Sequence, residues 1–269
     1  MTIDILICTI DDGVSGVSQV LMPPTPDVHY VVSMQHTRPL DECAEWGRAL
    51  DVLRQRSDVT VTTLEGRGLS RNRNNALQHA AADAIVIADD DCRYTPEAVV
   101  AIREAYEAYP DADVLCFEAI GFDGRPLKHY PSKSMNYADA CREGYSPASV
   151  ELAFRRDCFG RYGVRFDDRF GLGSEFPASE EFVLLHDIDQ AGGCIFFVPQ
   201  VIVSTDAATT GQRFLRDARQ QVTKGAAFRR CYGVSSALWR TLKEGSYHLV
   251  YNHANPLPIW LNMLRGIWK

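Results

Sequence analysis

Ala-Ile-Val-Ile-Ala-Asp-Asp-Asp-Cys, residues 84–92, begins as a strand and ends as an acidic turn. The first half has the length and the β-branched side chains of a strand buried on both faces. Asp89, Asp90 and Asp91 follow it directly. Adjacent carboxylates at the mouth of a buried strand repel one another, and a divalent cation with oxygen preference turns that repulsion into coordination. The stretch therefore predicts a cation site, with a merely solvated acidic turn as the alternative.

Length and composition indicate a folded globular protein. The chain has 269 residues and is 46% hydrophobic, which is enough for one large α/β domain or a domain with an appendage. No apolar run approaches 18 residues, and the start lacks the features of a signal peptide, so we expect a cytoplasmic location. Eight cysteines are scattered without a Cys-x-x-Cys pair, which favours reduced thiols over a zinc site or disulfides.

The elements on either side of residues 84–92 alternate between strand and helix. Buried strands are predicted at 3–8, 28–34 and 59–64, and helices at 40–53 and 69–81. This order predicts an α/β fold with a mostly parallel sheet flanked by helices. Ligands of such sheets bind beyond the carboxyl ends of the strands, where Asp89 to Asp91 lie.

A glycine- and arginine-rich segment precedes the acidic strand. It reads Gly66-Arg-Gly-Leu-Ser-Arg-Asn-Arg-Asn74. The glycines permit a tight turn, Ser70 can cap the following helix, and free backbone N–H groups beside an arginine suit an anion such as a diphosphate. An arginine-rich helix start that is only solvated is the alternative.

Together these blocks resemble the family 2 glycosyltransferases of the GT-A fold. The resemblance is carried by Gly-Leu-Ser-x-x-Arg-Asn at 68–74, by the Asp-x-Asp of Asp89 and Asp91, and by a third block. That block reads Phe-Asp-Asp-Arg-Phe-Gly-Leu-Gly at 166–173, then Glu180-Glu181 opening a helix, then a strand at 195–203. The resemblance implies a Rossmann-like sheet over residues 1–209, with a nucleotide-sugar half to about 95 and an acceptor half after it.

The resemblance also implies the donor chemistry. A leaving nucleoside diphosphate gains negative charge, which a carboxylate-held Mn²⁺ or Mg²⁺ neutralises. By position Asp91 is the expected metal ligand, Asp89 a ribose or metal contact, and Asp90 a less direct contact. Arg73 and Asn74 match the pair that contacts the nucleotide or its diphosphate; alternatively, Asn74 only fixes the loop.

A general base is implied on the acceptor side. The attacking hydroxyl must lose its proton to a carboxylate, and Glu180 and Glu181 are the candidates. Glu181 matches the family's base by position. A single in-line attack inverts the anomeric centre, so the resemblance implies an inverting transferase.

The sequence departs from the family at two places. Where the family often has a metal-binding His after its last strand, this chain has Ser-Thr-Asp, and Asp206 is a candidate substitute. The first strand lacks the usual ending, so Thr9, Asp11, Gln35 and also His36 are predicted to face the nucleotide only because they lie at strand ends.

Residues 210–269 form an electrostatically distinct extension. They contain ten Lys and Arg against Asp217 and Glu244, although the whole chain has a net charge of −7. Two helices are predicted at 214–232 and 236–242, followed by an apolar segment with basic ends that contains Trp260, Ile267 and Trp268. This composition favours a peripheral contact with an anionic membrane surface, and helices packed on the catalytic domain are the alternative.

The sequence thus predicts a hexosyltransferase-type enzyme of cell-surface polysaccharide synthesis. We expect a nucleotide-diphospho-sugar donor such as a UDP-sugar, a glycan or lipid-linked acceptor, and no nucleic-acid partner. A sugar-phosphate nucleotidyltransferase is one alternative, but the turn after the first strand lacks the expected glycine-rich basic loop. A non-catalytic nucleotide-sugar-binding protein is the other.

Overall fold

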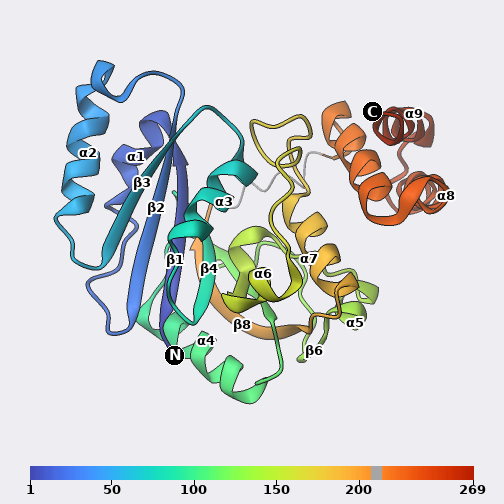
Figure 1. Cartoon of the computed structure of the whole chain (residues 1–269). Coiled ribbons are helices and arrows are strands. Elements are labelled where there is room, and N and C mark those ends of the chain that lie inside the picture. Colours follow the sequence, from blue (N-terminus) through green and yellow to red (C-terminus); the bar gives the residue numbers. More distant parts are fainter. Residues whose placement is uncertain (207–213) are drawn as a thin grey trace. The chain divides into compact units, whose positions relative to one another are not determined.

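The computed structural model describes residues 1–206 and 214–269 (Figure 1). The chain divides into two compact units. Unit 1 comprises Met1–Arg67, Arg71–Arg165 and Ile188–Ala207, and unit 2 comprises Gly68–Ser70, Phe166–Asp187 and Ala208–Lys269. The predicted domain boundary at 209/210 lies outside the described residues and stays a prediction.

Unit 1 is built on one sheet in the order β3-β2-β1-β4-β7-β5-β8-β6. Its strands are β1 Ile3–Ile10, β2 Val28–His36, β3 Val59–Glu65, β4 Ala84–Asp89, β5 Val114–Gly121, β6 Met135–Asn136, β7 Leu152–Arg155 and β8 Ile195–Thr205. The pairs β1–β2, β1–β4, β2–β3 and β5–β8 are parallel, whereas β7 is antiparallel to both β4 and β5. The six longer strands therefore run in one direction, and the predicted mostly parallel α/β sheet is confirmed.

Helices cover the sheet because alternate strand residues are apolar on both faces. One core cluster joins Ile3, Ile5 and Ile7 of β1 to Trp46 of α2 and Ile102 of α4. The helical elements of the chain up to residue 190 are η1 Asp11–Gly13, α1 Val14–Val17, η2 Leu40–Glu42, α2 Ala44–Arg54, α3 Leu69–His79, α4 Pro96–Ala108, α5 Tyr137–Arg142, η3 Ser149–Glu151, α6 Asp157–Tyr162 and α7 Glu180–Gln190. All eight cysteines are free.

The helix predicted at 40–53 is interrupted. Leu40–Glu42 forms a 3₁₀ turn, and α2 begins only at Ala44, because Cys43 has φ −126° and ψ 89°, outside the helical region. The apolar spacing is nevertheless satisfied, since Trp46, Leu50 and Leu53 are buried against the sheet. Periodicity thus identified the buried face correctly and missed the break.

The extension in unit 2 forms two helical elements, α8 Ala218–Asn252 and α9 Pro256–Ile267. α8 begins four residues later than predicted because the Asp217 side chain caps it, accepting a hydrogen bond from Arg219 N at 2.8 Å. Gly233, with φ 73° and ψ 176°, breaks the helical geometry within α8. Helix then continues to Asn252, ten residues beyond the predicted end.

The apolar residues expected to insert into a membrane are mostly inward-facing. Ile267 is fully buried between the two helices. Trp260 lies against Gly245 and donates a hydrogen bond to Leu242 O at 3.3 Å. Trp268 is exposed and Trp260 is half-buried, and the membrane contact of this segment stays a prediction. Among the described residues, no helix combines the length and the hydropathy needed to cross a bilayer.

Candidate active site

The acidic turn after β4 lies beside the end of β1. Parallel register places Cys8 opposite Asp89, so the residues that follow these two strands meet at the carboxyl edge of the sheet. There the Thr9 hydroxyl donates a hydrogen bond to Asp90 Oδ2 at 2.5 Å. Burial raises the pKa of Asp90, the bond from Thr9 opposes this rise, and the charges of Asp89 and Asp91 add to it. Asp90 is thus turned toward β1.

Gly13 makes this arrangement possible and was missed in the sequence. A Cβ at Gly13 would collide with the Asp90 carboxylate and the Thr9 hydroxyl. A side chain at this position would therefore displace the Asp90 carboxylate and the Thr9 hydroxyl. The sequence signal for Gly13 is its position four residues after Thr9 in an acidic loop.

Arg73 is fully buried and faces the acidic turn. Its Nη2 donates to Asp89 Oδ1 at 3.1 Å and to Ser149 Oγ at 2.8 Å. The Asp89 side chain remains 44% exposed, so Arg73 fixes this carboxylate while leaving it accessible. Ser149 was not predicted, because nothing in the sequence connects it to a residue 76 positions earlier.

Two asparagines on α3 hold the strand ends together. Asn72 is buried and its Nδ2 donates to Thr9 O and Ser33 O, both at 3.0 Å, while its Oδ1 accepts from Ser33 Oγ at 2.6 Å. Asn75 Nδ2 donates to the same Ser33 hydroxyl at 2.8 Å. The i, i+3 spacing puts both asparagines on one helix face, a signal present in the sequence that we did not use. The predicted Asn74 is half-buried.

Asp91 and Asp206 come from segments joined by a backbone bridge. Arg93 N donates to Ser204 O at 2.8 Å, and Ser204 N donates to Arg93 O at 3.0 Å. The bridge is isolated and antiparallel, so it holds the segment after Asp91 beside the end of β8, which Asp206 follows. Both aspartates are exposed. Arg93 is exposed as well, and its guanidinium lies 5.1 Å from the centre of the Phe122 ring.

The donor set at this edge fits a hard divalent cation. Carboxylate oxygens of Asp91, Asp89 and Asp206 are the ligand type that Mg²⁺ and Mn²⁺ prefer. Within residues 1–206 and 214–269, no group of three or more His, Cys, Asp or Glu is already arranged to hold a metal. One or two protein carboxylates are enough, however, when substrate phosphates supply further oxygens.

The other residues predicted to contact the nucleotide differ in the hydrogen bonds that they make within the protein. Gln35 is the next-to-last residue of β2 and is buried, and its Nε2 has no hydrogen-bond partner among the described residues. The Asp11 carboxylate accepts hydrogen bonds from Thr37 N and Thr37 Oγ1, each at 2.8 Å, so both of its oxygens already have partners. His36 Nδ1 contacts Arg38 O at 2.9 Å.

The predicted base lies at the start of α7 in unit 2. Glu180 is buried and Glu181 is half-buried. Ser179, directly before them, has φ 71°, a left-handed conformation that is costly for a residue with a side chain. Its carbonyl accepts the Val183 N–H at 3.1 Å and so begins the helix. A strained backbone residue thus sets the direction in which the two glutamates leave the chain.

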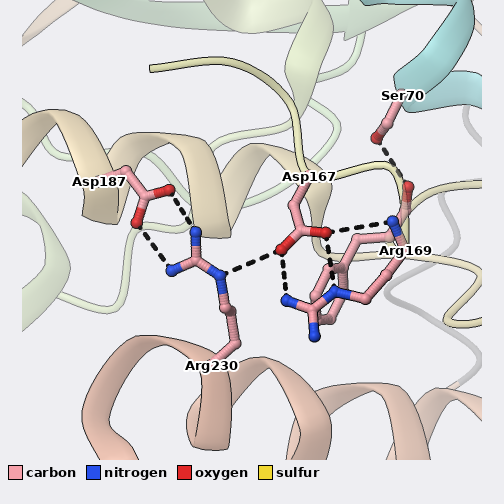
Figure 2. A network of polar contacts seen from close by, with 6 residues as sticks. Ser70, Asp167, Arg169, Asp187 and Arg230 are labelled. Atoms are coloured by element: carbon pink, nitrogen blue, oxygen red, sulfur yellow. Dashed lines mark hydrogen bonds and ion pairs between the residues drawn. The ribbon is translucent and has the colours of Figure 1, made fainter. Parts of the chain in front are cut away.

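A network of charged side chains joins the segment before Glu180 to α8 (Figure 2). Arg230 of α8 donates to Asp167 Oδ2 at 3.0 Å and to both oxygens of Asp187 at 3.0 and 2.8 Å. Arg169 also binds Asp167, at 2.6 and 3.0 Å. Burial would raise the pKa of Asp167, but the hydrogen bonds from Arg169 and Arg230 outweigh it and lower this pKa to about 2. In the same unit Ser70 Oγ donates to Phe170 O at 2.6 Å.

Comparison with known proteins finds a family that matches part of the chain. Residues 41–162 match the family described as Glycosyl transferase family 2. This range includes Arg73 and the acidic turn but not Glu180, Glu181 or Asp206. No curated protein matches the sequence.

Solved structures share the fold at low sequence identity. A crystal structure of S. aureus TarS has 13% identity and a TM-score of 0.61; the match covers 93% of this chain and 44% of that one. TarS 1-349 in complex with UDP has 12% identity and a TM-score of 0.64, with 94% and 73% covered. TarS 1-349 in complex with UDP-GlcNAc has 12% identity and a TM-score of 0.66, with 98% and 80% covered. This chain therefore spans less than half of the first of these structures, and identities this low show the fold alone. Together, the family match over residues 41–162 and the shared fold show that the chain carries a family 2 glycosyltransferase domain with the GT-A fold.

Proposed function

We propose that this chain transfers a sugar from a UDP-sugar to a glycan or lipid-linked acceptor, with inversion, in cell-surface polysaccharide synthesis. The family match and the fold support the transferase class. The complexes of TarS with UDP and UDP-GlcNAc support the choice of nucleotide. The observation that carries the proposal is the carboxyl edge of the sheet, where buried Arg73 holds the accessible carboxylate of Asp89 beside exposed Asp91.

On the donor side, Asp91, Asp89 and Asp206 would hold Mn²⁺ or Mg²⁺. When bound, the cation would neutralise charge on the departing diphosphate. Arg73 orients Asp89 through the 3.1 Å bond and thereby fixes one wall of this site. Asp90, which accepts from Thr9, braces the turn from the β1 side.

Nucleotide contacts are assigned to the other strand-end residues. The unpartnered, buried Nε2 of Gln35 is a donor that a bound nucleotide could satisfy, and leaving it unsatisfied costs free energy. Thr9, Asp11, Arg73 and Asn74 complete the proposed set. Asp11 supports the site through Thr37, because both of its oxygens already accept hydrogen bonds.

On the acceptor side, Glu181 is the proposed base and Glu180 the reserve candidate. The half-buried Glu181 is more accessible to an incoming hydroxyl than the buried Glu180. A carboxylate in the first turn of α7 is favoured in its ionised form by the helix dipole, which suits proton acceptance. The acceptor oxygen then attacks the anomeric carbon as the diphosphate leaves from the opposite side, and the configuration inverts.

The proposed organisation is a catalytic domain over 1–209 and a basic helical extension over 210–269. The extension would contact the inner face of a membrane peripherally, and this contact would bring a cytoplasmic enzyme to a lipid-linked acceptor. The rival nucleotidyltransferase function is disfavoured because β1 runs straight into η1 Asp11–Gly13, without a glycine-rich basic loop.

The test is a panel of nucleotide-sugars assayed for donor hydrolysis with and without Mn²⁺. We expect release of UDP from one or a few UDP-sugars, and loss of this release in chelator. Nucleotide binding without hydrolysis or transfer, with any acceptor supplied, would instead identify a non-catalytic binding protein.

A further inference from the structure

Helices α8 and α9 of unit 2 pack tightly through their inner faces. A Cβ at Gly225 would collide with Met263 O, and a Cβ at Gly266 would collide with Val222 O, so the two backbones touch. Ala237, Ile259 and Ile267 are buried in the same interface. The contact between the two helices is therefore already closely packed.

Both helices nevertheless carry large apolar side chains that are exposed to water. Trp239 and Val250 of α8 are 68% and 62% exposed, and Trp268 at the end of α9 is 68% exposed. Exposed apolar residues of this size in one helix pair are characteristic of an interaction surface. We call the following set the outer residues: Trp239, Leu242, Tyr247, Val250 and Tyr251 of α8, with Leu257, Leu261 and Trp268 of the α9 segment.

Three exposed cations lie near the outer residues in the sequence. Lys243 lies on the same helical stripe as Trp239 and Val250, at spacings of four and seven. Arg265 follows Leu261 by four residues, and the chain ends in Lys269. In the described part of the chain none of these three cations makes an ion pair.

Both acidic residues of the extension already interact with other groups of the extension. Asp217 caps α8. Glu244 binds Lys224 Nζ at 2.5 Å and His248 Nε2 at 3.1 Å. The outer residues, together with Lys243, Arg265 and Lys269, thus combine indole and phenol rings, aliphatic groups and cations without an acidic partner.

We propose that the outer residues are the face by which this chain binds a lipid bilayer with anionic headgroups. Tryptophan and tyrosine favour the headgroup level, and Lys and Arg attract anionic lipid. A second copy of the chain is a poorer partner, because a two-fold contact would bring these like charges together. The inference deepens, and rests on, the proposed membrane contact; it replaces the half-buried Trp260 and the buried Ile267 with a defined set of exposed residues.

The test is co-sedimentation of the full chain with vesicles of phosphatidylglycerol and, separately, of phosphatidylcholine. We expect binding to the anionic vesicles at low salt, a decline as salt screens the charges, and little binding to the neutral ones. Since one basic residue near an anionic surface contributes roughly fivefold to partitioning, K243E/R265E should reduce binding by tenfold or more. W239S/V250S should also weaken it by tenfold or more.

V52S/V100S is the matched control. These valines are about half exposed but lie on α2 and α4 of unit 1, so this variant should bind vesicles like the wild type. Thermal unfolding checks that all variants are folded. Equal binding by W239S/V250S and wild type, or no binding to anionic vesicles, would overturn the proposal.

A dimer in light scattering that W239S/V250S converts to a monomer, without vesicle binding, would also overturn it and assign the face to self-association. Donor hydrolysis is measured in parallel. A folded chain that binds vesicles but hydrolyses no donor would refute the proposed transferase and leave this face intact, so the two failures are distinguishable.

Discussion

The carboxyl edge of the sheet in unit 1 and the segment before α7 in unit 2 position carboxylates in different ways. At the sheet edge, strand register brings Asp89 beside β1, and side chains such as Arg73 and Thr9 then fix the turn. Before α7, the chain is irregular, and Gly171, Gly173 and Ser179 all have positive φ. This segment is held by the Asp167–Arg230 contact to α8.

The two regions differ in what fixes the positions of their side chains. Hydrogen bonds along the whole sheet fix the position of a strand end. A single substitution there therefore changes local side-chain contacts more than the position of the backbone. A loop carrying strained residues depends on the elements that surround it. Unit 2 should therefore be more sensitive to packing changes in α8 and α9 than unit 1 is to changes at the strand ends.

The largest expected effect comes from Gly225→Ala. Its Cβ would collide with a backbone carbonyl of α9, which cannot move aside as a side chain would, and we expect unit 2 to lose about 3 kcal/mol of stability. Calorimetric unfolding measures the loss. Gly47→Ala on α2, where an added Cβ meets nothing within 4 Å, is the control and should be neutral or slightly stabilising. Equal melting of Gly225→Ala and wild type would show that the helix pair is not tightly packed.

Glu181→Gln should lower turnover roughly a hundredfold, equivalent to about 2.7 kcal/mol, while largely preserving donor affinity. The amide keeps the shape of the side chain and removes its capacity to accept a proton. Steady-state transfer assays with UDP-binding titrations separate the two quantities. If Glu180→Gln gives the loss and Glu181→Gln does not, the base is the neighbouring residue.

Gly13→Ala should weaken turnover about tenfold, or ~1.4 kcal/mol, by pushing the Asp90 carboxylate and the acidic turn away from β1. Gly16→Ala, three residues later with open space around its Cβ position, is the matched control and should behave like the wild type. Parallel kinetics of the two variants test whether close approach of η1 matters, and identical rates would argue that it does not.

The smallest effect is expected at Ser179. Glycine adopts φ 71° without strain, so Ser179→Gly should change stability by about 1 kcal/mol or less, in the stabilising direction when strain relief exceeds the added chain entropy. Thermal melts at matched protein concentration measure it. A large destabilisation would mean that the serine side chain, rather than the backbone, anchors the start of α7.

The sheet could be predicted from the sequence because its main strands are long, apolar and rich in β-branched residues. The stretch 84–89 is β4, and the acidic turn lies at the carboxyl edge as predicted. The contacts of Gly13 and Ser149 could not be predicted from the sequence. Gly13 lies 77 positions from Asp90, and Ser149 lies 76 positions from Arg73. No periodic pattern encodes such pairs. The packing of the half-buried Trp260 against Gly245 could not be predicted for a similar reason, since that glycine belongs to the other helix.

The central claim is that the end of β4 holds the donor through a cation on Asp91. Its most direct measurement is calorimetric titration of UDP into the wild type, Asp91→Ala and Asp90→Asn, each in Mn²⁺ and in chelator. The account predicts tighter binding in Mn²⁺ for the wild type, loss of that difference and of transfer in Asp91→Ala, and a milder change in Asp90→Asn, whose side chain faces Thr9. UDP binding that is indifferent to Mn²⁺, together with an active Asp91→Ala enzyme, would contradict it.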